Sequence, residues 1–265
     1  LGLGPDVCLA RNPKLVYARI TGWGQDGPLA QVPGHDINYI ALSGALNAIG
    51  RKGGPPAVPL ALLGDMAGGA TYLSQGILAG IIEARSSGKG QVVDVSMLEG
   101  AISLSASIYG RRASGAWTLE RGSNMLDSGT HFYDVYECAD GRFIAVGANE
   151  KKFHDELVRR LGIDPAEIGD HLDRNNWEKH KQRLAECFRR RTRDEWCKVF
   201  EGVDTCFSPV LDFDEAPDHP HLKARKAFVE VDGITQPAPA PRFSRTPSEV
   251  SMPPQPITPE NTQKA

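Results

Sequence analysis

The segment Asp65–Ser96, DMAGGATYLSQGILAGIIEARSSGKGQVVDVS, contains the elements that decide the fold. Its residues up to Arg85 are mostly apolar or small, which predicts a helix packed in the core. We expect this helix to end at Gly88, because glycine readily adopts the left-handed conformation that closes helices. The residues Gln91–Ser96 then predict a buried strand.

The neighbouring segments extend this unit in both directions. Leu15–Thr21 is rich in β-branched and aromatic residues and precedes a glycine-rich loop, so it predicts a second buried strand. The apolar spacing predicts helices over Asp36–Gly50 and Met97–Tyr109. Strands that alternate with helices favour a parallel sheet covered by helices, and hence an α/β domain of Rossmann-like type.

A different pattern begins near Asn124. Two alternating segments, Thr130–Glu137 and Arg142–Gly147, flank an Asp-Gly pair and predict a β-hairpin. Lys151–Gly202 is helical and charged, and Thr192 with Glu195 predicts a capping box within it. These features predict a smaller α+β domain. We therefore divide the chain into a large domain (1–120), a small domain (121–235) and a return to the large domain (236–265).

Composition excludes several classes of function. The chain has 265 residues and a net charge of −3, which gives no basic surface for nucleic acid. No apolar run reaches the length of a membrane span. Five cysteines without a CxxC pair predict reduced thiols in a cytoplasmic protein, with neither a disulfide framework nor a metal site.

Three side chains could carry chemistry, although each also has an ordinary structural explanation. His35 lies at the start of a predicted helix, Asp65 opens the long apolar helix, and Glu150 follows a predicted strand. An acid near a helix start is favoured by the helix dipole, and a histidine can bond a backbone carbonyl. Their spacing alone therefore does not name a reaction.

Five ordered segments resemble those of the α-methylacyl-CoA racemases, a group within the family III (CaiB/BaiF-like) CoA-transferases. They are GHDINYIALSGAL (34–46), PLALLGDMAGG (59–69), SGKGQVVDVSMLEG (87–100), FYDVYECADGRFIAVGANE (132–150), and PVLDFDEAPDHPHLKARKAF (209–228) followed by QPAPAPRFSRTP (236–247). The resemblance runs from about Asn12 to Thr246. The first two segments are specific, whereas SGKGQ is shared across the wider family.

The resemblance implies an enzyme that inverts the α-carbon of an α-methyl-branched acyl-CoA thioester by removing and returning its proton, with the acyl group left open. His35 and Asp65 would be the two bases, and Glu150 would orient the histidine. Inversion is simplest with one acid/base on each face, and the enolate oxygen needs donors such as the backbone N–H groups near Asp65 and Met66. Contacts to CoA would come from Gly34, His35, Asp36, Ile37, Asn38 and Tyr39.

The resemblance also implies an interlocked homodimer, in which Glu150 completes the site of the partner chain. It implies no cofactor beyond the CoA of the substrate, and a further segment of the large domain before Leu1. Ala61 stands where the racemases usually have Asn, and Met66 and Ala70 also depart from their pattern. A family III CoA-transferase, with Asp65 as the nucleophile, therefore remains an alternative, as does a non-catalytic CoA-binding subunit.

Overall fold

The computed structural model describes residues 2–250 and 252. The predicted return to the large domain (236–265) therefore lies partly outside the described residues, which do not include 251 and 253–265. The chain forms two compact units, Leu1–Ser208 and Pro209–Ala265. The domain boundaries predicted at residues 120 and 235 stay predictions.

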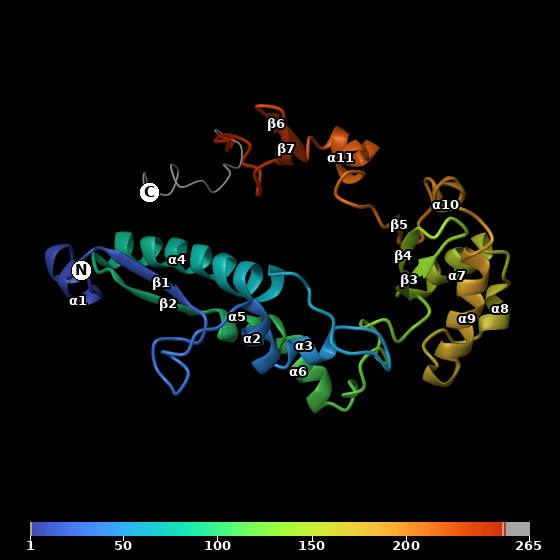
Figure 1. Ribbon diagram of the computed structural model, residues 1–265, viewed down its shortest axis with the longest axis horizontal. Coiled ribbons are helices and arrows are strands. Elements are labelled where there is room, and N and C mark those ends of the chain that lie inside the picture. The colour runs from blue at the N-terminus through green and yellow to red at the C-terminus, as the bar shows by residue number, and fades with distance from the viewer. Residues whose placement is uncertain (1, 251, 253–265) are drawn as a thin grey trace. The chain divides into compact units, whose positions relative to one another are not determined.

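A parallel strand pair organises residues 5–113, which we call the strand–helix region. β1 (Val16–Thr21) pairs with β2 (Gln91–Ser96), with Val16 opposite Gln91 and Thr21 opposite Ser96. Helix α4 (Tyr72–Ser87) lies along both strands (Figure 1). The predicted parallel sheet is confirmed, and with it the α/β character of this region.

Two glycines let α4 approach the strands closely. A Cβ on Gly76 would lie 2.6 Å from a methyl carbon of Val93, and one on Gly80 would lie 2.9 Å from a methyl carbon of Val16. Both distances are shorter than van der Waals contact. Any larger residue would therefore push the helix away from the sheet.

The long helix predicted from Asp65 to Arg85 is built in two parts. A π-helix, η1 (Leu62–Thr71), precedes α4 directly and contains Asp65. Gly88 closes α4 with φ 76° and ψ 6°, so the predicted left-handed cap is confirmed. The π-helical conformation has no signal in the periodicity, and such segments are frequent at functional sites.

The other helices of this region are shorter than the apolar pattern indicates. The segment predicted as one helix over 36–50 divides at Gly44, whose φ is 83°. The segment predicted over 97–109 divides at Ser105. The elements are α1 (Pro5–Arg11), α2 (Asp36–Leu42), α3 (Ala45–Ala48), α5 (Met97–Leu104) and α6 (Ala106–Ala113).

Residues 130–208, here called the α+β region, form a three-stranded sheet with helices. β3 (Tyr133–Glu137) and β4 (Phe143–Gly147) make the predicted hairpin, and β5 (Phe207–Pro209) adds to β4. Thr192 accepts a hydrogen bond from the N–H of Glu195, which confirms the capping box. The helices are α7 (Lys151–Arg160), α8 (Pro165–Ile168), η2 (Arg174–Asn176), α9 (Trp177–Phe188) and α10 (Arg193–Phe200).

The continuous hydrophobic core lies in the α+β region. Its fully buried members include Phe132, Ile144, Leu157, Leu184 and Phe188. These side chains come from both the sheet and the helices. The α+β region therefore has a core of its own.

The second compact unit is small. It contains η3 (Ala216–Asp218), α11 (Pro220–Ala224) and a hairpin of β6 (Phe228–Val231) with β7 (Ile234–Pro237). Asp232 and Gly233 join the two strands with positive φ angles of 51° and 77°. This is the Asp-Gly turn that suits tight hairpins.

In the described part of the chain, no helix combines the length and the apolar character that crossing a bilayer requires.

Candidate functional site

His35 is held at the start of α2, where the loop after β1 turns into the helix. It is the N-cap residue, and its side chain is exposed. Its backbone N–H donates to the Oδ1 of Asn38 at 3.0 Å, which fixes the first turn. The imidazole is thus presented to solvent on a well-defined backbone.

Asp36 connects the start of α2 to the start of η1. Its side chain is buried, with 4% of its surface exposed. One carboxylate oxygen, Oδ2, accepts hydrogen bonds from the backbone N–H of Gly64 at 2.6 Å and of Asp65 at 2.8 Å. Residues 28 and 29 positions apart along the chain are therefore held at one point.

Asp65 is half-buried in the first turn of η1. Burial raises the pKa of its carboxyl group, and the negative charge of Asp36 raises it further, whereas the positive charge of His35 lowers it. A carboxyl group of raised pKa is therefore held beside the segment that carries the His35 imidazole. Groups of this kind suit proton transfer near neutral pH.

Close packing of α5 holds the other side of η1. A Cβ on Gly68 would lie 2.8 Å from the backbone nitrogen of Ala101, and one on Gly100 would lie 1.9 Å from the carbonyl oxygen of Gly68. A Cβ on Gly69 would lie 3.0 Å from the side chain of Met97. The glycines after Asp65 thus serve the approach of a facing helix.

The structure corrects one sequence-based expectation about the enolate donors. The N–H of Asp65 already donates to Asp36, so it is not free to bind a substrate oxygen. The sequence could not reveal this, because the acceptor lies in a segment distant along the chain.

Tyr39 is packed inside the protein, although the resemblance places it along the CoA arm. Its side chain is 7% exposed. Its ring lies edge-on to Trp23 at 4.8 Å and fills the space above Gly22. Its hydroxyl donates to the carbonyl of Gly34, and burial, followed by the charge of Asp65, raises its pKa. Ile37 and Asn38 are exposed. Contact of the 34–39 segment with CoA stays a prediction.

Glu150, the third predicted catalytic residue, belongs to a different element from the other two. It is the exposed N-cap residue of α7 in the α+β region. Its charge acts on Cys206, whose pKa is raised mainly by burial and then by Glu150. The structure therefore joins the His35–Asp36 segment to Asp65, whereas a contact of Glu150 with this site stays a prediction.

A cavity of about 1000 Å³ opens within the first compact unit. It is lined by Leu63 of η1 and by residues of α3, α6, the 117–128 loop and strands β3 and β4, but neither His35 nor Asp65 lines it. The cavity therefore does not by itself single out the predicted catalytic residues.

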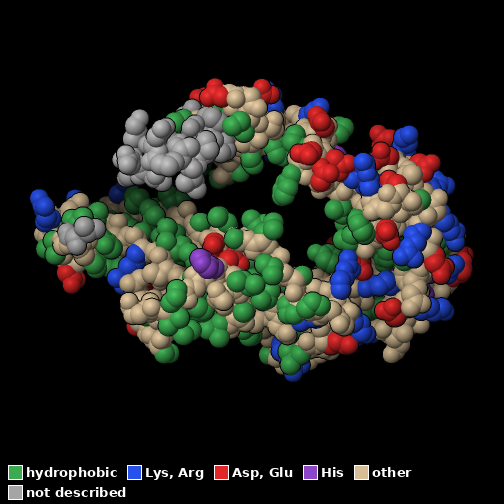
Figure 2. All heavy atoms as spheres, in the orientation of Figure 1, with side chains coloured by type: hydrophobic (Ala, Val, Ile, Leu, Met, Phe, Trp, Pro, Cys, Tyr) green, Lys and Arg blue, Asp and Glu red, His purple; other side chains and the backbone are tan. Residues whose placement is uncertain are grey.

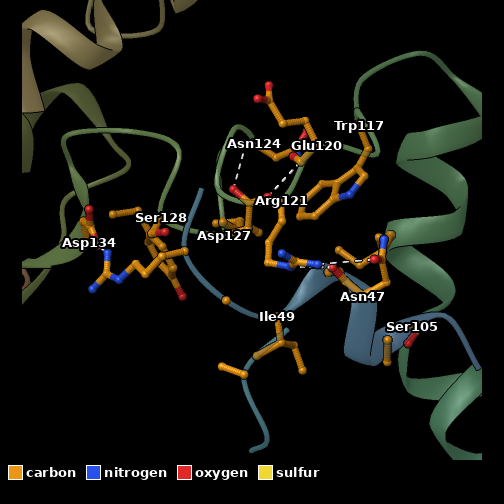
Figure 3. Close-up of a pocket in the computed structure, with 18 of the residues that line it drawn as sticks. Asn47, Ile49, Ser105, Trp117, Glu120, Arg121, Asn124, Asp127, Ser128 and Asp134 are labelled. Atoms are coloured by element: carbon orange, nitrogen blue, oxygen red, sulfur yellow. Dashed lines mark hydrogen bonds and ion pairs between the residues drawn. The ribbon is translucent and has the colours of Figure 1, made fainter. Parts of the chain in front are cut away.

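The polar groups around this cavity are largely paired with one another. Figure 3 shows Arg121 pointing toward Asn47, to whose backbone oxygen its Nε donates at 2.8 Å. Asp127 accepts from the backbone N–H groups of Gly122, Asn124 and Gly129 at 3.1, 2.7 and 3.2 Å. These bonds hold the 117–129 loop in shape.

Comparison with known proteins places the chain in a family. The family model for "CoA-transferase family III" matches residues 1–262. The chain belongs to this family. The resemblance inferred from the ordered motifs is thereby confirmed.

Among the relatives, those named alpha-methylacyl-CoA racemase are notably similar. The mouse protein is 44% identical over 99% of the chain, and the human protein is 41% identical over all of it. In each case the chain corresponds to 69% of the relative. Relatives named as CoA-transferases are more distant, for example human succinyl-CoA:glutarate CoA-transferase at 25% identity, where the chain covers 60% of the relative.

Solved structures agree on the fold. The Mycobacterium tuberculosis protein Rv3272 matches with a TM-score of 0.74 and 25% identity, over 96% of this chain and 67% of its own. A CaiB/BaiF family protein from Brucella suis matches with a TM-score of 0.74 over 93% of this chain and 66% of its own. The chain therefore has the α/β fold of this family.

Proposed function

We propose that the chain is an α-methylacyl-CoA racemase, an enzyme that interconverts the two configurations at the α-carbon of a methyl-branched acyl-CoA thioester. The similarity to the mouse and human racemases supports this activity. The observation that carries it is the hydrogen bond from the backbone N–H of Asp65 to the carboxylate of Asp36, which holds the start of η1 against the segment that carries His35.

The chemistry follows from two bases on opposite faces of the substrate. One base removes the α-proton, and the C–H electron pair moves into the thioester to form an enolate. The protonated partner then delivers a proton to the other face, which inverts the configuration. No electrons are gained or lost, so we propose that the reaction needs no cofactor beyond the CoA of the substrate.

The CoA-transferase alternative is not favoured. In that reaction Asp65 would attack the thioester carbonyl and carry the acyl group covalently. The relatives named as transferases are less similar than the two racemases. A transferase has no comparable use for the exposed imidazole of His35 beside the carboxyl group.

Exchange of the substrate α-hydrogen with D₂O tests the proposal. We expect the chain to catalyse this exchange on a 2-methylacyl-CoA, and both His35→Ala and Asp65→Asn to reduce it by about 10²–10⁴-fold, the usual contribution of one acid/base group. Mass spectrometry of the protein after mixing provides the contrast. A covalent acyl adduct on Asp65 without exchange would overturn the racemase assignment in favour of the transferase.

We further propose that the protein works as a homodimer in which Glu150 completes the site of the partner chain and orients its His35. The exposure of Glu150 at the N-cap of α7 supports this arrangement. All five cysteines are free, which supports a reducing, cytoplasmic location.

Complementation between two inactive variants tests the shared site. Asp65→Asn and Glu150→Gln should each lose most of the exchange activity. If each site uses Asp65 of one chain and Glu150 of the other, a mixed dimer has one site with both lesions and one intact site. Mixing after dissociation should then restore activity, whereas variants mixed without dissociation are the control. Failure to recover activity in verified mixed dimers would contradict a shared site.

A further inference from the structure

Asp36 presents an unusual arrangement of hydrogen bonds for a buried carboxylate. Its Oδ2 accepts two backbone N–H groups from η1, whereas its Oδ1 is buried without a hydrogen-bond partner among the described residues. Among the described residues, no ion pair neutralises it. A buried charge that is only half satisfied costs stability, so its retention calls for an explanation.

The two hydrogen bonds that Asp36 accepts come from the first turn of η1, which contains Asp65. The donors are the N–H of Gly64 and that of Asp65 itself. The first N–H groups of a helix have no acceptor within the helix, so the first turn of η1 depends on acceptors from elsewhere. The carboxylate supplies that acceptor from α2, the helix that His35 caps.

Gly64 shows how tightly this contact is built. A Cβ on Gly64 would lie 2.9 Å from the Oδ2 of Asp36 and 3.3 Å from the Asp36 backbone oxygen. Any side chain at this position would push the two segments apart. The absence of a side chain at residue 64 therefore serves the bond between α2 and η1.

We propose that Asp36 is a positioning residue for the reaction, which fixes the Asp65 carboxyl group relative to His35 by tying the start of η1 to the start of α2. This inference rests on the proposed racemase function and adds a role that contact with CoA would not require. The Asp36 charge also keeps the Asp65 carboxyl group more basic, since a neighbouring negative charge disfavours ionisation.

Two substitutions separate the hydrogen bonds from the charge. Asp36→Asn keeps an oxygen acceptor of the same shape but removes the charge. We expect kcat within about tenfold of the wild type, and we expect the limb of the pH profile that reports Asp65 to move to lower pH. Asp36→Ala removes both features, and we expect kcat to fall by about 100-fold with little change in KM, because misplacing a reacting group costs about that much.

Controls distinguish positioning from other roles. Asp164→Asn alters another carboxylate that caps a helix, where Oδ1 of Asp164 accepts from the N–H of Ala166 at 2.9 Å, and it should leave kcat and the pH profile unchanged. Thermal unfolding of each variant confirms that it is folded at the assay temperature. An Asp36→Ala enzyme with a raised KM and an unchanged kcat would instead assign Asp36 to CoA binding and overturn the proposal.

A readout independent of activity keeps the inference separate from the racemase assignment. The Asp65 carboxyl resonance, assigned by comparison with Asp65→Asn, can be titrated by carbon NMR in the wild type and in Asp36→Asn. We expect a lower pKa in the variant. If the wild type exchanges no α-hydrogen but this shift occurs, the proposed reaction fails while the link from Asp36 to Asp65 stands. Identical titrations, together with equal kcat values in both Asp36 variants, would refute the link.

Discussion

In the α+β region large side chains fill the space between helices and sheet, whereas in the strand–helix region glycines bring the backbones themselves together. Phe132, Leu184 and Phe188 are completely buried in the first region. In the second, Gly68 and Gly100 leave no room for a single Cβ between η1 and α5. One region is stabilised by buried apolar area and the other by close backbone approach.

The two regions also differ in the hydrophobic side chains that they leave exposed. In the strand–helix region, large hydrophobic side chains remain exposed on α4 and around η1, including Leu62, Met66, Leu78 and Ile82. Hydrophobic side chains are visible over these elements in Figure 2. Both faces of a parallel sheet are normally covered. Because these hydrophobic side chains stay exposed, the region that holds His35 and Asp65 buries less apolar surface in a core of its own than the α+β region does.

Truncation of a large, completely buried core side chain should produce the biggest effect on stability. Phe188 is completely buried and lies against the rings of Tyr136 and Trp196, with centroids 5.1 and 5.3 Å away. We expect Phe188→Ala to lower the free energy of unfolding by about 3–5 kcal/mol, since it removes buried area and leaves a cavity. Urea unfolding followed by tryptophan fluorescence measures this.

The matched control is Ile82→Ser on α4, where the side chain is 69% exposed. In an isolated chain this substitution removes few contacts, so we expect the free energy of unfolding to change by no more than about 0.5 kcal/mol. A loss as large as that of Phe188→Ala, or a change in sedimentation, would mean that another chain covers this face. The contrast between the two regions would then hold only for the isolated chain.

Lowering the pH should reduce the stability of the α+β region, because this region contains a cluster of buried histidines. The Nε2 atoms of His131 and His154 are 2.9 Å apart, and the rings of His154 and His171 stack at 4.7 Å. Burial, and then the neighbouring histidines His154, His180 and His171 and Lys181, lower the pKa of His131 to about 2. Burial lowers the pKa of His154 to about 4, partly opposed by Asp155.

The direction of the pH effect follows from these pKa values. The unfolded chain binds protons below its ordinary histidine pKa of about 6.5, whereas the folded histidines stay neutral. The stability that these neutral histidines contribute is therefore fully present above that pH. It falls as the pH drops toward about 4 for His154 and about 2 for His131, by up to about 1.4 kcal/mol per pH unit for each group.

Urea midpoints between pH 7.5 and 5.5 measure this slope. His131→Gln should reduce the slope, whatever its effect on stability at neutral pH. His221→Gln, which changes an exposed histidine in the second compact unit, should leave it unchanged. A slope equal in the wild type and His131→Gln would remove the histidine cluster as the cause of acid sensitivity.

The local elements of both regions were predictable because short-range rules specify them. The Asp140-Gly141 turn, the Thr192–Glu195 capping box and the Gly88 cap each follow from backbone preferences of single residues. The strands Val16–Thr21 and Gln91–Ser96 follow from their β-branched content. The divided helices at Gly44 and Ser105 were missed, because apolar periodicity continues across both breaks.

The site was predictable only in part. The ordered motifs were sufficient to identify the family to which the chain belongs, because the pattern of residue types carries that information. The catalytic roles of His35 and Asp65 stay predictions. The bond from Asp36 to Gly64 and Asp65 was not predictable from spacing, since it joins segments 28 and 29 residues apart and needs the folded backbone of both.

The sequence by itself determined the parallel strand pair, the hairpin and the family to which the chain belongs. Only the tertiary structure decided that Asp65 lies in a π-helix, that Tyr39 is buried against Gly22 and Trp23, and that Asp36 binds the start of η1. The physical reason is that burial and charge at a site are set by all the segments that meet there. Burial raises the pKa of the Asp65 carboxyl group, and the charge of Asp36, which α2 brings to the start of η1, raises it further.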